Sequence, residues 1–317
     1  MVKKILPLAV CALALAGCSN AKTNDSAATP VPATTATTSE ATSTKPTVLV
    51  SLYPIEYIVR QIGGDDVNVK SLAPAGVEPH DLELSPKEVA EVPQADLVVY
   101  LKGFQAAVDK AVEQGSPKDA LNIYDFANIK PAKPGQHDDD HDHEHLAFDP
   151  HFWLNPSNMA SVGDAVASEL KKIAPAKAEA FQQRNSEFQA KMLGLTKDAI
   201  DSLSNCKHDT FITTHEAFAY LARLTNTKQQ GLSGLDPESA PSPARLAEIS
   251  KVVKEKGINT IFTEDLVSPK VAQTLSKDLG VKTEVLSPIE SQTDASKDYA
   301  DMFSGDIKQL HTALECQ

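Results

Sequence analysis

The sequence predicts an α/β protein in which two Rossmann-like lobes with mostly parallel sheets are joined by one long α-helix. Short β-branched strands alternate with helices both before and after the middle of the chain, and this alternation is typical of parallel sheets. Between the two alternating regions, about fifty residues from Pro156 onward have a helical pattern and no strand. The length of 317 residues also exceeds that of one ordinary domain.

The first 17 residues have the features of a bacterial export signal. Lys3 and Lys4 precede an apolar run over residues 5–16 that is too short to cross a bilayer as a stable helix. The run leads into LAGC at residues 15–18, and small residues before a cysteine resemble a bacterial lipobox. This predicts a signal peptide over 1–17 and a lipid anchor on Cys18. The alternative is a secretory signal with a chance cysteine, and both predict an extracytoplasmic protein, at the cell surface or in the periplasm.

The residues after Cys18 predict a flexible spacer and then the folded part. Residues 18–46 are mostly Ala, Thr, Ser and Pro, a composition that cannot bury a core and therefore predicts a disordered tether. Beyond it we expect three regions, which are an N-terminal lobe over 47–175, a linking helix over 176–204 and a C-terminal lobe over 205–317.

The N-terminal lobe is expected to alternate strands with helices. An apolar run followed by Pro54 indicates a strand and then a helix, and Ser85 followed by Pro86 supplies the N-cap and first turn of another helix. Gly115 marks the end of a third helix. The predicted strands are residues 47–52, 66–73, 95–101 and 120–126.

Residues 128–146 interrupt this alternation. They contain prolines and a glycine, lack hydrophobic periodicity and include the acidic, histidine-rich stretch HDDDHDHEH at 137–145. Long segments without secondary structure are usually functional or disordered. We therefore predict a loop over 136–146 that is either a metal-binding element or a solvated acidic segment.

The linking helix and the C-terminal lobe follow. Apolar residues recur at helical spacing along the linking helix, at Phe181, Phe188, Leu195, Ala199 and Leu203. The lobe after it has predicted strands at 209–214, 258–264 and 281–288 and predicted helices at 215–224, 242–257, 269–280 and 296–314.

Charge and cysteine content limit the possible partners and the compartment. The net charge of −13 argues against binding nucleic acid or anionic membranes through bulk charge and suits a cationic ligand. With Cys11 in the signal and Cys18 lipidated, Cys206 and Cys316 remain as a pair in an oxidising compartment. They predict a disulfide, the alternative being two unpaired buried thiols.

Four polar residues lie at predicted strand–helix junctions, one of them between Pro150 and Pro156, and we consider them metal-ligand candidates. They are His80, His151, His215 and Glu290. Ligands bind at the carboxyl ends of parallel strands, so side chains from both lobes could converge there. Three imidazoles and one carboxylate suit a tetrahedral zinc site, and four protein ligands leave no open position for hydrolysis. Zinc would displace protons from histidine, so the affinity is expected to fall below about pH 6.

Longer motifs around these residues resemble one family. Four segments are similar to the zinc-binding solute-binding lipoproteins of bacterial metal ABC importers, the cluster A-I metal-binding proteins. They are GVEPHDLELSPKEVAEVPQADLVVYLKGF, DPHFWLNP, TTHEAFAYLARL and VLSPIE. The similarity extends from residue 47 to about residue 315 and includes the lipobox. It implies a monomer that takes Zn²⁺ to an ABC permease and its ATPase.

The resemblance also implies roles for individual residues. It assigns the ligands to His80, His151, His215 and, fourth, Glu290. Some members lack an acid at the fourth position, and Asp294 and Glu264 are the alternative carboxylates. Manganese-type relatives typically carry Glu where this chain has His215, so His215 favours zinc. The resemblance also implies that histidines of the loop bind further zinc. This binding is expected to be weak, because flexible ligands lose entropy on binding. The loop histidines are His137, His141, His143 and His145.

Other functions stay open at this point. A manganese- or iron-specific member of the family would share the motifs, as would a metal-dependent adhesin or a zinc scavenger without a transporter. A zinc hydrolase is a further alternative, although HEAFA is not the HExxH protease motif because Ala219 stands where the second histidine is needed.

Overall fold

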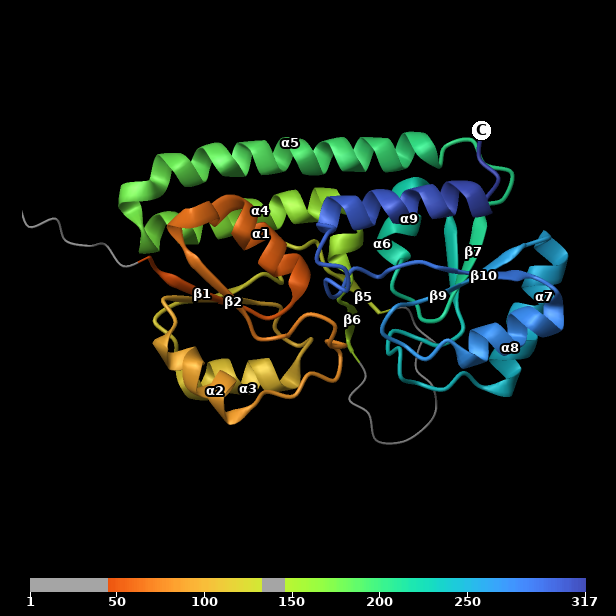
Figure 1. Cartoon of the computed structure of the whole chain (residues 1–317), viewed down its shortest axis with the longest axis horizontal. Coiled ribbons are helices and arrows are strands. Elements are labelled where there is room, and N and C mark those ends of the chain that lie inside the picture. Colours follow the sequence, from red (N-terminus) through yellow and green to blue (C-terminus); the bar gives the residue numbers. More distant parts are fainter. Residues whose placement is uncertain (1–44, 133–145) are drawn as a thin grey trace, which may run out of the picture. The chain divides into compact units, whose positions relative to one another are not determined.

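A computed structural model describes residues 45–132 and 146–317 of the chain (Figure 1). All described residues belong to one compact unit. The predicted signal peptide, Cys18, the tether as far as residue 44 and the loop histidines lie outside the described residues. Those four histidines are His137, His141, His143 and His145.

The first lobe contains a parallel four-stranded sheet with the strand order β2-β1-β3-β4. Its inner strands β1 and β3 are built almost entirely from buried Val and Leu, as expected of strands covered on both faces. The strands are β1 (Thr47–Val50), β2 (Asn68–Ser71), β3 (Leu97–Tyr100) and β4 (Ala120–Asn122). The helices are α1 (Tyr53–Gly63), α2 (Pro86–Glu91) and α3 (Ala106–Gly115), with short 3₁₀ turns at η1 (Gly64–Asp66) and η2 (Val92–Gln94).

The second lobe repeats this topology. Its parallel sheet has the order β10-β9-β7-β8, so in each lobe the first strand lies between the second and the third. The strands are β7 (Thr210–Thr213), β8 (Lys228–Gly231), β9 (Thr260–Thr263) and β10 (Lys282–Val285). The helices are α6 (Ala219–Thr225), α7 (Pro243–Lys256), α8 (Lys270–Leu279) and α9 (Tyr299–Ala313). In such sheets the point where the strand order reverses is where ligands bind.

One long helix connects the lobes, as predicted. Helix α4 (Pro156–Ile173) leads through η4 (Pro175–Lys177) into the 25-residue helix α5 (Ala178–Ser202). Figure 1 shows α5 alongside α4 and reaching α9, and α5 contacts both of these helices as well as α1. Phe181 and Phe188 of its predicted apolar stripe are buried. The two lobes therefore share a helical layer.

Two features differ from the sequence-based expectation. Residues Lys130–Pro131 (β5) and Phe148–Asp149 (β6) pair as a short antiparallel ribbon, with β5 inside the segment 128–146, where no strand was predicted, and β6 just after it. Strand β8 was not predicted because KQQG has no apolar pattern, and its hydrogen bonds to β7 hold it at the sheet edge. Neither difference moves a candidate ligand.

The predicted disulfide is present. Cys206 and Cys316 are bonded and enclose a separation of 110 residues. This bond ties the start of the second lobe to the end of the chain.

Within the described ranges, the structure has no helix that is both long and apolar enough to cross a membrane.

Candidate metal centre

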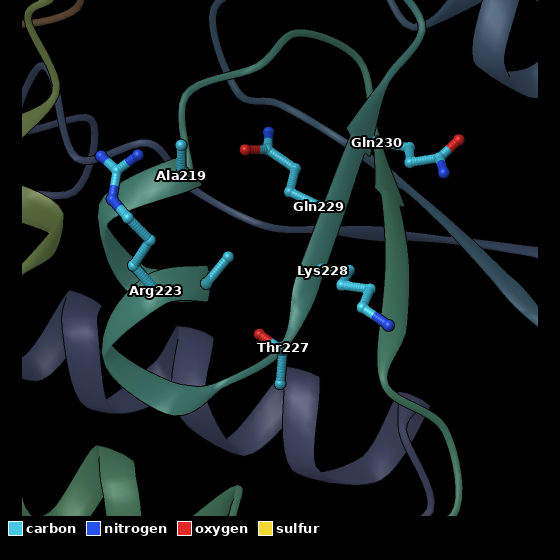
Figure 2. Close-up of a pocket in the computed structure, with 7 residues that line it drawn as sticks. Ala219, Arg223, Thr227, Lys228, Gln229 and Gln230 are labelled. Atoms are coloured by element: carbon cyan, nitrogen blue, oxygen red, sulfur yellow. The ribbon is translucent and has the colours of Figure 1, made fainter. Parts of the chain in front are cut away.

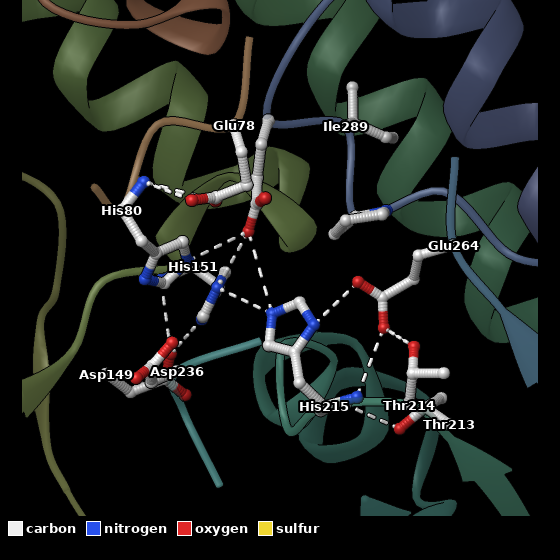
Figure 3. Close-up of polar contacts among 12 residues, drawn as sticks. Glu78, His80, Asp149, His151, Thr213, Thr214, His215, Asp236, Glu264 and Ile289 are labelled. Carbon is white, nitrogen blue, oxygen red and sulfur yellow. Dashed lines mark hydrogen bonds and ion pairs between the residues drawn. The ribbon is translucent and has the colours of Figure 1, made fainter. Parts of the chain in front are cut away.

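The four predicted ligand residues converge in the structure. One ligand atom from each of His80, His151, His215 and Glu290 lies within 4.8 Å of the others (Figure 3). His80 follows β2, His151 precedes the 3₁₀ turn η3 (Phe152–Leu154), His215 follows β7 and Glu290 follows β10. The first two come from the N-terminal side of α5 and the other two from the second lobe. All four side chains are at least nine-tenths buried.

A single oxygen of Glu290 lies at the centre of the cluster. Its Oε1 is 3.2 Å from Nε2 of His80, 3.0 Å from Nε2 of His151 and 3.7 Å from Nε2 of His215. Nε2 of His151 and Nε2 of His215 are 3.3 Å apart. Three imidazole nitrogens and one carboxylate oxygen thus face one point, which is the donor set of a four-coordinate zinc site.

The cluster also shifts the proton equilibria of its members. Burial disfavours the charged form of His215, but the charge of Glu264 and hydrogen bonds to Glu264 and Glu290 outweigh it and raise the pKa of His215 well above its ordinary value. The pKa of His151 is raised in the same way by Asp149 and Glu290 against the effect of burial. Burial alone would raise the pKa of Glu290, yet the charge of His80 and the histidine hydrogen bonds lower it well below the usual range. Metal binding must therefore displace protons.

The loop that carries His80 is held through its backbone. The Glu78 carboxylate accepts hydrogen bonds from the backbone N–H of His80 at 3.1 and 3.0 Å and from that of Asp81 at 3.3 Å. The buried side chain of Gln105 donates to the carbonyl oxygen of Pro79 at 3.2 Å. The edge of the His80 ring also contacts Phe104, with the ring centroids 4.9 Å apart. These contacts fix the loop without binding the second ring nitrogen of His80.

His151 is fixed by the residue two positions before it. Oδ1 of Asp149 accepts from the backbone N–H of His151 at 3.1 Å and lies 2.9 Å from the ring atom Nδ1. Asp149 is itself held in the ribbon β5–β6. The sequence DPH therefore supplies both a ligand and the group that orients it.

His215 is oriented by Glu264 from the neighbouring strand. Glu264 directly follows β9, which pairs with β7 next to His215. Its Oε2 lies 2.6 Å from Nδ1 of His215, while Oε1 accepts from the backbone N–H of His215 at 3.1 Å and from the hydroxyl of Thr214. Glu264, considered above as an alternative ligand, thus lies on the side of the ring away from the cluster. Asp294, the other alternative, is on the surface and bonds to Ser296.

The segment before Glu290 has a strained backbone and strong anchors. Ile289 has a φ of 55°, which is unfavourable for a β-branched residue, and its side chain is fully buried. Nε1 of Trp153 donates to the carbonyl oxygen of Pro288 at 2.7 Å, and the backbone N–H of Ser287 donates to Asp306 at 3.0 Å. These bonds hold the strained turn that aims Glu290 at the histidines. The strand-end pattern predicted Glu290 but gave no sign of this turn.

One cavity among the described residues borders the cluster, and another lies apart from it. A cavity of about 10 Å³ beside Glu264 and Glu290 has room for about one water molecule. A larger cavity of about 300 Å³ lies between α6 and β8, and none of the four cluster residues lines it (Figure 2). The residues that line it are Ala219, Ala222, Arg223, Thr227, Lys228, Gln229 and Gln230.

The chain matches a known protein family over most of its length. A family model described as zinc-uptake complex component A, periplasmic (ZnuA), matches residues 48–313. The chain belongs to this family. The match confirms the resemblance to zinc-binding solute-binding proteins that the motifs predicted. The names of two relatives describe zinc binding and zinc uptake.

Two curated relatives cover nearly all of the chain. The zinc-binding lipoprotein AdcA of Streptococcus pneumoniae is 34% identical over 321 residues, which is 98% of this chain and 60% of AdcA. The high-affinity zinc uptake system protein ZnuA of Bacillus subtilis is 31% identical over 324 residues, with 97% and 96% of the two chains covered. The chain thus spans about 60% of the AdcA relatives and nearly the whole length of the ZnuA relative.

Solved structures have the same fold. Zn(II)-bound AdcA from Streptococcus pneumoniae has a TM-score of 0.72 and 33% identity, covering 86% of this chain and 59% of AdcA. The laminin-binding adhesin Lmb of Streptococcus agalactiae, in a mutant form, has a TM-score of 0.77 and 29% identity, covering 85% and 99% of the two chains. The two-lobed α/β fold expected from the sequence is therefore confirmed.

Proposed function

We propose that this chain is an extracytoplasmic solute-binding protein that captures Zn²⁺ between its two lobes and delivers it to the permease of an ABC importer with its ATPase. The ion would be held by Nε2 of His80, His151 and His215 and by the carboxylate of Glu290. The observation that carries the proposal is the convergence of these four atoms within 4.8 Å of one another. Membership of the ZnuA family and the zinc-bound relative AdcA support the same cargo.

The burial of the cluster favours capture over catalysis. Four protein donors leave zinc without the open position that a hydrolytic water needs. The small cavity beside Glu290 has no room for a substrate. Zinc is accordingly the cargo of the protein and not a cofactor for chemistry.

The remaining parts of the chain have proposed roles in delivery. Residues 1–17 would direct export, and a lipid on Cys18 with the tether 18–46 would keep the lobes near the membrane. The lobes would cover residues 47–175 and 205–317 on either side of the linking helix 176–204, and the protein would act as a monomer. The histidines of loop 136–146 would hold additional zinc more weakly than the buried cluster.

Calorimetric zinc titration of the full mature chain tests the cargo and its site. We expect one tight site in the wild type and its loss in His215→Ala. A variant lacking residues 136–146 should keep the tight site and lose any weaker ones. Loss of the tight site with that deletion would contradict the ligand assignment, and manganese or iron binding tighter than zinc would contradict the cargo.

Adhesion is a second candidate function. It is favoured by the similarity to Lmb, one structure of which is described as a bifunctional protein with adhesin and metal transporting activity, at a TM-score of 0.75 and 28% identity. Surface plasmon resonance with immobilised laminin, on zinc-loaded and metal-free protein, tests it. Saturable binding would support adhesion, and no binding in either state would exclude it for laminin.

A further inference from the structure

Two buried carboxylates, Asp149 and Glu264, face the outer nitrogens of two imidazoles in the cluster. Oδ1 of Asp149 is 2.9 Å from Nδ1 of His151, and Oε2 of Glu264 is 2.6 Å from Nδ1 of His215. Asp149 and Glu264 are 4% and 6% exposed. In each pair the other ring nitrogen, Nε2, faces Glu290 and the centre of the cluster (Figure 3).

Other partners do not explain why these carboxylates are buried. Within the described residues, no lysine or arginine forms an ion pair with Glu264, whose remaining partners are the Thr214 hydroxyl and the backbone N–H of His215. Among the described residues, Asp149 has one further ion-pair partner, the half-exposed Arg223 at 3.9 Å. A buried carboxylate is costly unless hydrogen bonds compensate it, and here the donors are the backbone and the ring of one histidine, with the Thr214 hydroxyl in addition at Glu264.

The chemistry of the pairs determines which ring nitrogen carries the proton. An ionised carboxylate only accepts hydrogen bonds, so the nitrogen that faces it must be the N–H. When zinc displaces the proton on Nε2, each imidazole would keep its proton on Nδ1 and present the lone pair of Nε2 to the ion. The opposite tautomer would direct a proton at the metal and could not bind it.

The pairs also change the charge of the loaded site. Zn²⁺ with Glu290 alone would leave one positive charge buried among neutral imidazoles. Asp149 and Glu264 place two further carboxylates at hydrogen-bond distance from the ligand rings, so the remaining positive charge would have acidic groups close to it. His80 has no such carboxylate at Nδ1 among the described residues, and its loop is held by Glu78 and Gln105 through the backbone.

We propose that Asp149 and Glu264 are positioning residues for zinc, which fix the Nδ1–H tautomer and the ring orientation of His151 and His215. This proposal rests on the proposed zinc-binding function. It separates the three histidines into two that are oriented by a carboxylate and one, His80, that is oriented through its loop. Removing either carboxylate should weaken zinc binding although no ligand atom is lost.

The test uses the full mature chain with the near-isosteric substitutions Asp149→Asn and Glu264→Gln. Zinc affinity is measured by competition with a chelator, and loss of such a partner typically weakens metal binding about 10–100-fold. Glu315→Gln is the matched control, because Glu315 faces His208 at 3.5 Å outside the cluster. It should bind zinc like the wild type. If Glu264→Gln does not fold, Asp149→Asn on the other side of the linking helix gives an independent result.

Nitrogen-15 NMR of the histidine rings in the zinc-loaded protein measures the Nδ1–H signals directly. These signals would not change if the carboxylates only stabilised the fold. The wild type should show two Nδ1–H protons strongly shifted by carboxylate hydrogen bonds, and each substitution should remove the shift of its own partner only. Wild-type affinity in both variants, or unchanged Nδ1–H signals, would overturn the proposal. Absence of zinc binding in the wild type would instead overturn the proposed function on which it rests.

Discussion

Nε2 of His151 lies 3.0 Å from Oε1 of Glu290, although 139 positions separate the two residues in the sequence. His151 precedes the linking helix and Glu290 belongs to the second lobe, so this contact connects the two sides of the molecule. A zinc ion bound at this point would take ligands from both sides. Zinc binding there would therefore be coupled to the contact between the two sides.

Glu290→Gln should weaken zinc binding at least tenfold, which corresponds to about 1.4 kcal/mol. The substitution keeps the shape of the side chain and removes the only charged group among the four proposed ligands. Chelator competition measures the effect, with Asp294→Asn as the control because Asp294 is a surface acid nearby in sequence. Equal affinities of Glu290→Gln and the wild type would show that the carboxylate is not a ligand.

Zinc affinity should fall with decreasing pH from a higher pH than an unshifted histidine would predict. The pKa values of His151 and His215 are raised above the ordinary 6.5, because hydrogen bonds and charges from buried carboxylates outweigh burial. Zinc must displace these protons, so affinity should start to weaken above pH 6.5 and not only below about pH 6. Affinity measured in half-unit pH steps tests this. A constant affinity down to pH 6 would contradict the raised pKa values.

The metal-free protein should gain stability from the cluster mainly between about pH 4.5 and 6.5. The raised pKa of His151 and of His215 gives stability that is fully present below 6.5 and is lost as the pH rises through the folded-state value. The lowered pKa of Glu290 gives stability that is present above 4.5 and is lost as the pH falls through its folded-state value. Urea unfolding of the wild type and Glu290→Gln should differ most inside this window. A difference that does not vary with pH would exclude this linkage.

Trp153→Phe should lower the free energy of unfolding by about 2–4 kcal/mol, since it leaves a cavity and removes the hydrogen-bond donor to the Pro288 carbonyl. It should also weaken zinc binding, because Pro288 lies two residues before Glu290. Phe152→Leu is the control, a buried neighbour without a polar contact to that segment. Equal loss of zinc affinity in both variants would mean that the bond to Pro288 does not orient Glu290.

Replacing both Cys206 and Cys316 with Ser should destabilise the fold and leave the zinc site intact. The bond encloses a separation of 110 residues, and the loop-entropy model gives a contribution of about 4–5 kcal/mol for that length. Urea unfolding of wild type and double variant measures it. Neither cysteine belongs to the cluster, so zinc affinity should be unchanged at temperatures where the variant is folded. A fall in affinity would reveal a link between the chain end and the site.

Much of the fold was predictable because local signals and packing agree. Ser85 and Pro86 begin α2 with a capping box, and Gly257 ends α7 with a φ of 65°. His80, His215 and Glu290 follow the parallel strands β2, β7 and β10, as the strand-end pattern predicts, whereas His151 follows the antiparallel strand β6. Strand β8 could not be predicted, because its four residues have no apolar alternation and owe their conformation to pairing with β7.

The orientation of the site was beyond sequence patterns. Glu264 was predictable as an acid after a strand, but its position behind His215 depends on the pairing of β7 with β9. The positive φ of Ile289 has no local signal, because a β-branched residue is among the least expected there. It is imposed by bonds from distant residues such as Trp153.

Zinc-edge anomalous diffraction from crystals of the zinc-loaded protein tests the ligand assignment most directly. We expect one dominant peak bonded to Nε2 of His80, His151 and His215 and to a carboxylate oxygen of Glu290, at about 2.0–2.2 Å. A dominant peak bound by the histidines of loop 136–146, or one that excludes Glu290 or any of the three histidines, would contradict the assignment.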